Sequence, residues 1–393
     1  MLQTLSRHRL AVIYLSNLLL SFHYFLILYI HSSYLGTFFS ASQLALLYML
    51  GSAINLVLFF NLPYILGRIG NYKFTLWAII LEAAAISGLI FGSTAVSVGI
   101  SFVLHQAVIS MILFGLDIFL EGATKDEQKT GSVRGLYLTL SNITLVFSPL
   151  IVGILLVAEN FWTVYLVSLM FLFPLFFLIK KYLREAKYKK TERVHILKTL
   201  SDCKKNKDVR GILLAQFCLQ FFYAFMVIYM PIYLHKYIGF SWQEIGVIFT
   251  VMLLPFMLFE LPIGTLADKK LGEKELLVAG FTVMAIATFC IPLLQNKILL
   301  AWAGLLFLTR VGASFVEITS ESYFFKHVNE QNTGLISLFR MTRPLSFIIA
   351  PAFVTFSLYF LLAQDASYGY IFSLLGLLML FGVKHALTLK DTK

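Results

Sequence analysis

The residues best able to do chemistry are polar and charged side chains that stand in rows inside long apolar stretches. At 100° per residue along a helix, the members of each row fall on one face. A charged side chain in an apolar environment must face a partner or water, so each row predicts a polar face turned toward a shared aqueous space. Two rows carry charge: Gln106, Ser110, Asp117 and Glu121, and Arg310, Ser314, Glu317 and Glu321.

Two further rows are uncharged. One is formed by Asn17, Ser21 and Tyr24, and the other, 199 positions later, by Gln216, Gln220 and Tyr223. Together with the charged rows they predict a substrate cavity. The alternative is that the same side chains hydrogen-bond neighbouring helices to one another, and for Asn17 and the serines the sequence leaves both interpretations open. For Arg310, near the middle of its stretch, we expect cavity lining. The residues predicted to line the cavity are Asn17, Ser21, Tyr24, Gln106, Ser110, Gln216, Gln220, Tyr223 and Arg310.

The carboxyl groups of the charged rows divide into two pairs. Glu121 and Glu321 lie near the ends of their stretches, where we expect interfacial ion pairs. Asp117 and Glu317 lie one turn deeper, where burial favours the protonated form of a carboxyl group. A group that exchanges protons with a gradient needs this property, so these two are predicted to couple to protons. Glu82 is a further buried acid, and nothing in the sequence pairs with it.

The elements that position these rows are apolar runs long enough to cross a bilayer, which takes about 20 residues. Of the 393 residues, 59% are hydrophobic and 13% charged, whereas a soluble domain has roughly a quarter charged residues. Only helices satisfy the backbone polar groups of such runs. We therefore expect an all-α membrane protein with twelve transmembrane helices, at about 10–31, 41–65, 73–92, 95–121, 133–158, 161–181, 211–235, 243–267, 275–294, 298–325, 335–362 and 366–385.

Basic residues gather in alternate loops between the predicted helices. By the positive-inside rule this places both termini in the cytoplasm. The largest group lies at 180–210, where 12 Lys and Arg face four acids. We expect it to set topology and to contact anionic lipid head groups, because no motif supports nucleic-acid binding. The protein is predicted to be a multi-pass protein of a bacterial inner membrane.

The sequence repeats itself around this basic segment. The string at 127–131, EQKTG, returns as EQNTG at 330–334, and further matches follow at offsets of 199 and 200. Six helices per half make this a parallel repeat, whose binding site is expected between the halves. The expected parts are a six-helix bundle at 1–183, a basic linker at 184–209 and a second bundle at 210–393.

One loop carries a family signature: GTLADKKLGEK, at 264–274. It resembles the loop that the major facilitator superfamily (MFS) has between the second and third helices of a half, with one extra residue before Gly272. The resemblance covers the whole chain, and it implies that this loop latches to neighbouring helix ends in the outward-open state. The first-half copy, at 61–73, lacks the aspartate. The implied latch residues are Gly264, Asp268, Lys270, Gly272, Glu121, Glu321, Arg134 and Arg340.

A second motif is similar to the glycine-proline motif of the family's proton antiporters. Gly135, Pro149 and Gly153 match part of its spacing, whereas Thr144 and Val152 stand where glycine is expected. This favours export. The family's arginine in the fourth helix is missing, and Arg310 in the tenth stands at the equivalent depth.

The predicted function is secondary active transport of a small solute, coupled to protons, with export of amphipathic compounds as the leading hypothesis. An importer of sugars or organic acids is the alternative within the fold; a membrane sensor or an intramembrane enzyme is the alternative from another class. The motifs H-E-x-x-H, G-x-S-x-G and the P-loop are absent, so we expect no enzyme.

Cysteine and histidine usage indicates no cofactor. Three widely spaced cysteines predict neither a metal cluster nor a disulfide framework. His23 and His105, which lie well inside predicted spans, are expected to be hydrogen-bonded helix residues rather than ligands. We expect a monomer without metal or cofactor, whose partners are its substrate, protons and membrane lipids.

Overall fold

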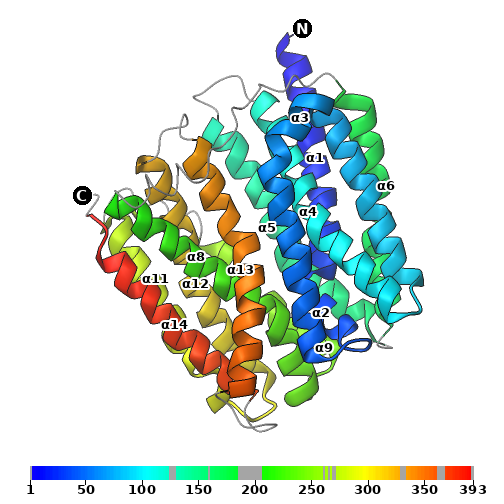
Figure 1. Cartoon of the computed structure of the whole chain (residues 1–393). Helices are drawn as coiled ribbons and strands as arrows, with labels where there is room; N and C mark the ends of the chain where they lie inside the picture. The colour runs from blue at the N-terminus through cyan, green and yellow to red at the C-terminus, as the bar shows by residue number, and fades with distance from the viewer. Residues whose placement is uncertain are drawn as a thin grey trace. The chain divides into compact units, whose positions relative to one another are not determined.

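The computed structural model describes residues 2–123, 130–157, 160–184, 206–259, 262–263, 266–267, 271–327, 333–360 and 368–390. Helices make up nearly all of these residues, and strands are absent from them. The chain separates into two compact units, Met1–Arg193 and Val194–Lys393 (Figure 1). Most of the expected linker lies outside the described residues.

In the first unit, α1 is the central helix: it packs against α4, α5 and α6, while α3 packs against α4 and α6. These contacts bring three predicted spans around α1. The helices are α1 (Leu2–Leu28), α2 (His31–Leu35), α3 (Ala41–Phe91), α4 (Ala95–Ala123), α5 (Thr130–Leu155) and α6 (Phe161–Tyr182).

The long helix α3 covers two of the predicted spans. It is kinked at Gly70, which has φ 74° and ψ 159°. Glycine takes this conformation without the clash that a Cβ would cause. A single residue therefore makes the turn between the two limbs of α3.

In the second unit, α8 packs against α12, α13 and α14, and α11 packs against α12 and α14. The helix α8 continues into a short π-helix, η2, and a 3₁₀ turn, η4, follows α11. The elements are α8 (Lys207–Ile232), η2 (Tyr233–Tyr237), α9 (Trp242–Leu258), α11 (Glu273–Phe289), η4 (Ile291–Leu293), α12 (Leu299–His327), α13 (Thr333–Phe360) and α14 (Tyr370–Leu387).

Ten helices of the described part are long and apolar enough to cross a membrane, and α9 is a shorter apolar helix. Large apolar side chains are exposed on them, among them Phe91 and Leu300, each 80% exposed. Such surfaces fit contact with lipid rather than water. The all-helical fold is confirmed, whereas the twelve-span topology and the side on which the termini lie stay predictions.

Equivalent helices of the two units begin in the same way. Ser40 before α3 and Ser241 before α9 both form capping boxes, with Gln43 and Glu244 three residues on. Each box satisfies helix N–H groups that would otherwise lack partners.

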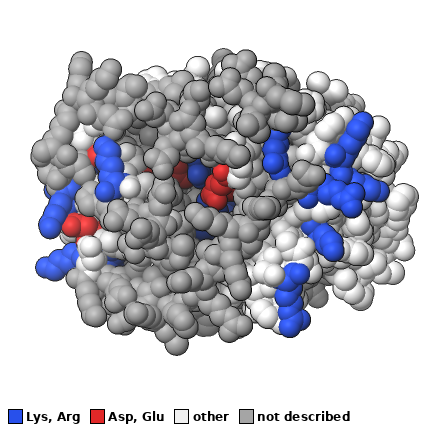
Figure 2. Space-filling view, turned by 90° about the horizontal axis from the view of Figure 1, so that it is seen from above, with Lys and Arg blue, Asp and Glu red and all other residues white. Residues whose placement is uncertain are grey.

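Figure 2 looks onto the end of the molecule at which α1 begins, and Lys and Arg side chains lie on its described surface. By the positive-inside rule this end is the expected cytoplasmic side.

Candidate functional site: polar and charged groups inside each unit

The second unit brings a predicted coupling residue together with a predicted cavity residue. Tyr223 on α8 donates a hydrogen bond of 2.8 Å to Oε2 of Glu317 on α12. One turn further along α12, Ser320 donates a hydrogen bond to Oε1 of Gln216 on α8 at 3.0 Å. The facing polar rows of α8 and α12 therefore meet each other, as their helical periodicity allows.

Arg310 lies on the same helix pair and is 1% exposed. Its guanidinium stacks over the rings of Phe222, at 5.0 Å, and Tyr223, at 5.4 Å. Within the described part of the chain, Nε and Nη1 of Arg310 have no hydrogen-bond partner. Aromatic faces attract a cation but leave its N–H groups unsatisfied. Arg310 can thus receive oxygen acceptors from a ligand.

The uncharged row of the first unit joins two helices. Asn17 donates to the carbonyl of Tyr137 at 2.8 Å and to Oγ of Ser141 at 2.9 Å. Ser21 bonds the same Ser141 hydroxyl at 3.0 Å. These contacts are of the helix-joining kind, between α1 and α5. Tyr24, in the same row, is buried.

The row on α4 is bonded in a similar way to α3. Gln106 donates to Oγ of Ser52 at 3.3 Å. Asn55 donates to Ser110 and, at 2.7 Å, to the carbonyl of Ala107. Asp117 lies half-buried further along α4, and on α8 Gln220 is also half-buried.

The predicted latch is described in part. Gly272, with φ 83°, precedes α11, whereas Gly264, Asp268 and Lys270 lie outside the described residues. Among the predicted latch residues at helix ends, Glu121, Glu321 and Arg134 are exposed and Arg340 is half-buried.

Sequence reasoning missed an ion pair beside this loop. Glu273, 1% exposed, accepts a hydrogen bond of 2.9 Å from Ser322 and pairs with Lys326, both on α12. Ser322 and Lys326 are four residues apart on one helical face, and this spacing was the available signal. The pair fixes the start of α11 against the end of α12.

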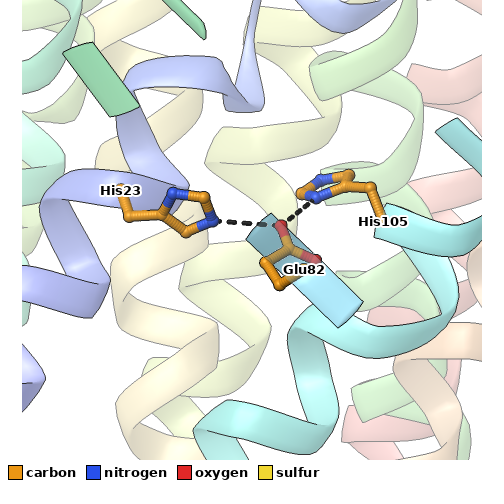
Figure 3. A group of neighbouring side chains, drawn as sticks. All are labelled: His23, Glu82 and His105. Atoms are coloured by element: carbon orange, nitrogen blue, oxygen red, sulfur yellow. Dashed lines mark hydrogen bonds and ion pairs between the residues drawn. The ribbon is translucent and has the colours of Figure 1, made fainter. Parts of the chain in front are cut away.

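Sequence reasoning also missed a cluster in the first unit that joins three helices. Glu82 on α3 lies between two imidazole rings, His23 of α1 and His105 of α4 (Figure 3). Oε1 of Glu82 is 3.0 Å from Nε2 of His23 and 2.5 Å from Nδ1 of His105. The expectation that both histidines are hydrogen-bonded is confirmed. Residues from three different helices share no spacing, so only their apolar surroundings marked them in the sequence.

The outer nitrogens of both rings have partners as well. Nδ1 of His23 lies 3.1 Å from the carbonyl of Ser168 and 2.8 Å from its hydroxyl. Nε2 of His105 lies 3.0 Å from Nε2 of His31, whose Nδ1 is 2.9 Å from the hydroxyl of Tyr165. All of these side chains are buried. The cluster is therefore one continuous hydrogen-bonded chain through the interior of the first unit.

The chain is similar to known proteins in sequence family and in fold. The family model described as Major Facilitator Superfamily matches residues 10–351 and 212–391. A crystal structure of a point mutant of the nucleoside transporter NupG is similar, with a TM-score of 0.76 and 12% identity over 96% of this chain and 99% of that chain. At that identity the likeness shows the fold alone. A search of curated proteins gave no significant match.

Proposed function

Because the chain belongs to the Major Facilitator Superfamily, we propose that it is a secondary active transporter that moves a small solute by alternating access, coupled to protons. The observation that carries the proposal is the position of Tyr223. Its hydroxyl bonds Glu317 and its ring stacks against Arg310. One side chain thus contacts both the proposed proton site and the proposed substrate site.

The coupling works through the charge on Glu317. An ionised carboxylate is the stronger acceptor for a phenol hydroxyl, so proton uptake weakens the bond from Tyr223. The tyrosine ring is then free to move relative to the guanidinium of Arg310. Proton binding and substrate binding therefore influence each other through Tyr223, and Asp117 serves the same purpose in the first unit.

We propose export of small amphipathic compounds as the physiological direction, on the basis of the partial glycine-proline motif. Import of a polar solute is the second candidate, and the two unpartnered nitrogens of Arg310 favour it. These donors suit a substrate with several oxygen acceptors, such as a sugar, an organic acid or a nucleoside. The similar fold of a nucleoside transporter makes nucleosides worth including in a screen.

The first experiment identifies the substrate. A thermal-shift screen in detergent covers sugars, amino acids, organic acids, nucleosides and lipophilic cations, because a ligand raises apparent stability by mass action. At least one class is expected to raise the unfolding temperature of the wild type and not that of Arg310→Ala. No stabilisation by any class would favour a sensor over a transporter.

The second experiment tests coupling in proteoliposomes with an imposed pH gradient. Glu317→Gln and Asp117→Asn should each reduce gradient-driven transport while substrate exchange survives. Glu275→Gln is the matched control, since Glu275 is an exposed carboxylate in the first turn of α11. If both variants respond to the gradient as the wild type does, the coupling assignment is wrong.

A further inference from the structure

The buried cluster of His23, Glu82 and His105 has no part in the proposed transport cycle. Its three side chains are at most 1% exposed. One ligand atom from each lies within 4.8 Å of the other two. From this geometry we propose that the cluster binds one divalent transition-metal ion, and that Zn²⁺ fits it best.

The donor set is the first argument. Two imidazole nitrogens and a carboxylate are ligands that Zn²⁺ commonly takes, with a fourth position left for water. Tetrahedral bonds of about 2.0–2.1 Å place ligand atoms roughly 3.3 Å apart. The two histidine nitrogens are 3.0 and 2.5 Å from Oε1 of Glu82. An ion between them therefore requires the groups to move apart by less than about 1 Å.

The second argument is the other oxygen of the carboxylate. Oε2 of Glu82 is buried and, among the described residues, has no hydrogen-bond partner. Buried carboxylate oxygens are nearly always satisfied by a donor or an ion. Both histidines crowd onto Oε1 instead, which leaves Oε2 as a ready ligand.

The third argument concerns where the ring protons lie. Nδ1 of His23 faces the carbonyl of Ser168 at 3.1 Å, and a carbonyl only accepts. The Ser168 hydroxyl lies 2.8 Å from the carbonyl of His23, to which it donates. Nδ1 therefore carries a proton, and in neutral His23 the lone pair of Nε2 points at Glu82. A lone pair and a carboxylate repel each other unless a proton or a metal cation stands between them, and a metal ion would satisfy both groups.

Partners of this kind are usual around metal sites. Histidine ligands generally donate their second ring N–H to a carbonyl or another acceptor, which fixes the ring. His23 does so to Ser168, and His105 reaches the ring of His31. The metal would tie α1, α3 and α4 together, and a bound hydroxide would complete the neutralisation of its charge.

The second unit offers a comparison within the same chain. At the offsets of 199 and 200 that relate the halves, His23 corresponds to Phe222 and His105 to Leu305. The second unit therefore has no imidazole at either of these two positions. We expect one ion per chain.

The test begins with protein purified without a histidine tag and analysed for metal. Since the site is buried, the ion should survive purification, and wild type should hold about one Zn²⁺ per chain, either as purified or after one equivalent is added. Glu82→Gln and His23→Gln should lose it. His8→Gln is the matched control, because His8 is exposed on the same helix as His23, and it should keep the ion.

X-ray absorption at the zinc edge of the wild type tests the site without any variant. The proposal requires two imidazole nitrogens and carboxylate oxygen at about 2.0–2.1 Å. A chelator should lower the unfolding temperature of wild type and His8→Gln. Wild type that stays metal-free after loading, zinc that lacks imidazole ligands, or zinc content unchanged in a folded Glu82→Gln would each overturn the proposal and leave a cluster that holds only protons.

Discussion

The two units use equivalent positions for opposite chemistry. In the first, Nε2 of His23 lies 3.0 Å from the buried carboxyl of Glu82, and Ser110 is a neutral acceptor for Asn55. In the second, the counterpart of His23 is Phe222 and that of Ser110 is Arg310, and these two stack at 5.0 Å. The repeat thus preserves which helices carry polar groups but not which group is charged.

The units also differ in how their closest helix pairs are joined. Between α3 and α4, Asn55 and Asn71 donate to the carbonyls of Ala107 and Gly115. Between α11 and α12, a Cβ on Gly312 would lie 2.5 Å from the carbonyl oxygen of Gly280. Amide side chains thus bond backbone carbonyls between α3 and α4, whereas two glycines bring the backbones of α11 and α12 together; both are established ways to join helices in a membrane.

The largest effect is expected at Arg310, whose counterpart in the first unit is Ser110. Arg310→Ala removes a buried charge that faces two rings, and we expect transport to fall by roughly 10- to 100-fold. Ser110→Ala should cost much less, because Ser110 is already bonded within its own unit. Initial rates in proteoliposomes measure both. Equal losses would mean that the two positions have the same role.

The next largest effect, on stability, is expected at Gly312, where α12 lies close to α11. Gly312→Ala places a Cβ against backbone atoms of Gly280 and Met284, closer than 3.0 Å. Overpacking of this kind should destabilise the protein by about 2 kcal/mol. Gly304→Ala, on the same helix, has nothing within 4 Å of the new Cβ and should be neutral. Thermal unfolding in detergent compares the pair, and equal stabilities would contradict a close α11–α12 contact.

Loss of the side-chain hydrogen bonds between α3 and α4 should reduce stability less. Asn55→Leu removes two hydrogen bonds to α4 while keeping a similar volume, for a loss of roughly 1 kcal/mol. Asn61→Leu is the control, because Asn61 is exposed on the same helix and donates to the carbonyl of Val57 within that helix. Unfolding temperatures that do not separate these two variants would show that the contact between α3 and α4 does not depend on its amides.

Much of this comparison was accessible from the sequence. Apolar runs predicted the helices, and the repeated string at 127–131 and 330–334 predicted that the two halves repeat; in the structure α5 and α13 begin inside the two copies, at Thr130 and Thr333. Helical periodicity placed Tyr223 and Glu317 on polar faces. Their bond to each other required the packing of α8 on α12, which sequence spacing does not encode.

Other features had weaker signals or none. The capping boxes could have been found from the S-x-x-Q and S-x-x-E patterns at Ser40 and Ser241. The partners of Glu82 could not, because His23 and His105 reach it from separate helices. The pairing of Asn17 with Ser141 is similar: periodicity gave the face, and only the packing of α1 on α5 decided what that face meets.

The smallest expected effect concerns the two capping boxes. Ser40→Ala and Ser241→Ala should each cost about 1 kcal/mol or less. The loss should be larger at Ser241, since Glu244 of that box also pairs with Lys297 at 3.0 Å. High salt should narrow the difference because it screens an exposed ion pair. A difference that persists in high salt would point to packing rather than charge.

The single-residue turn at Gly70 has a consequence for how the chain can change in length. Each limb of α3 is continuous helix up to that residue, so no loop is present to absorb a lost residue. Deleting Gly70 would force a helical residue to make the turn or rotate the following limb by about 100°. Such a rotation would carry Glu82 away from both histidines. Deletions at this elbow should therefore be far less tolerated than substitutions in the helices on either side.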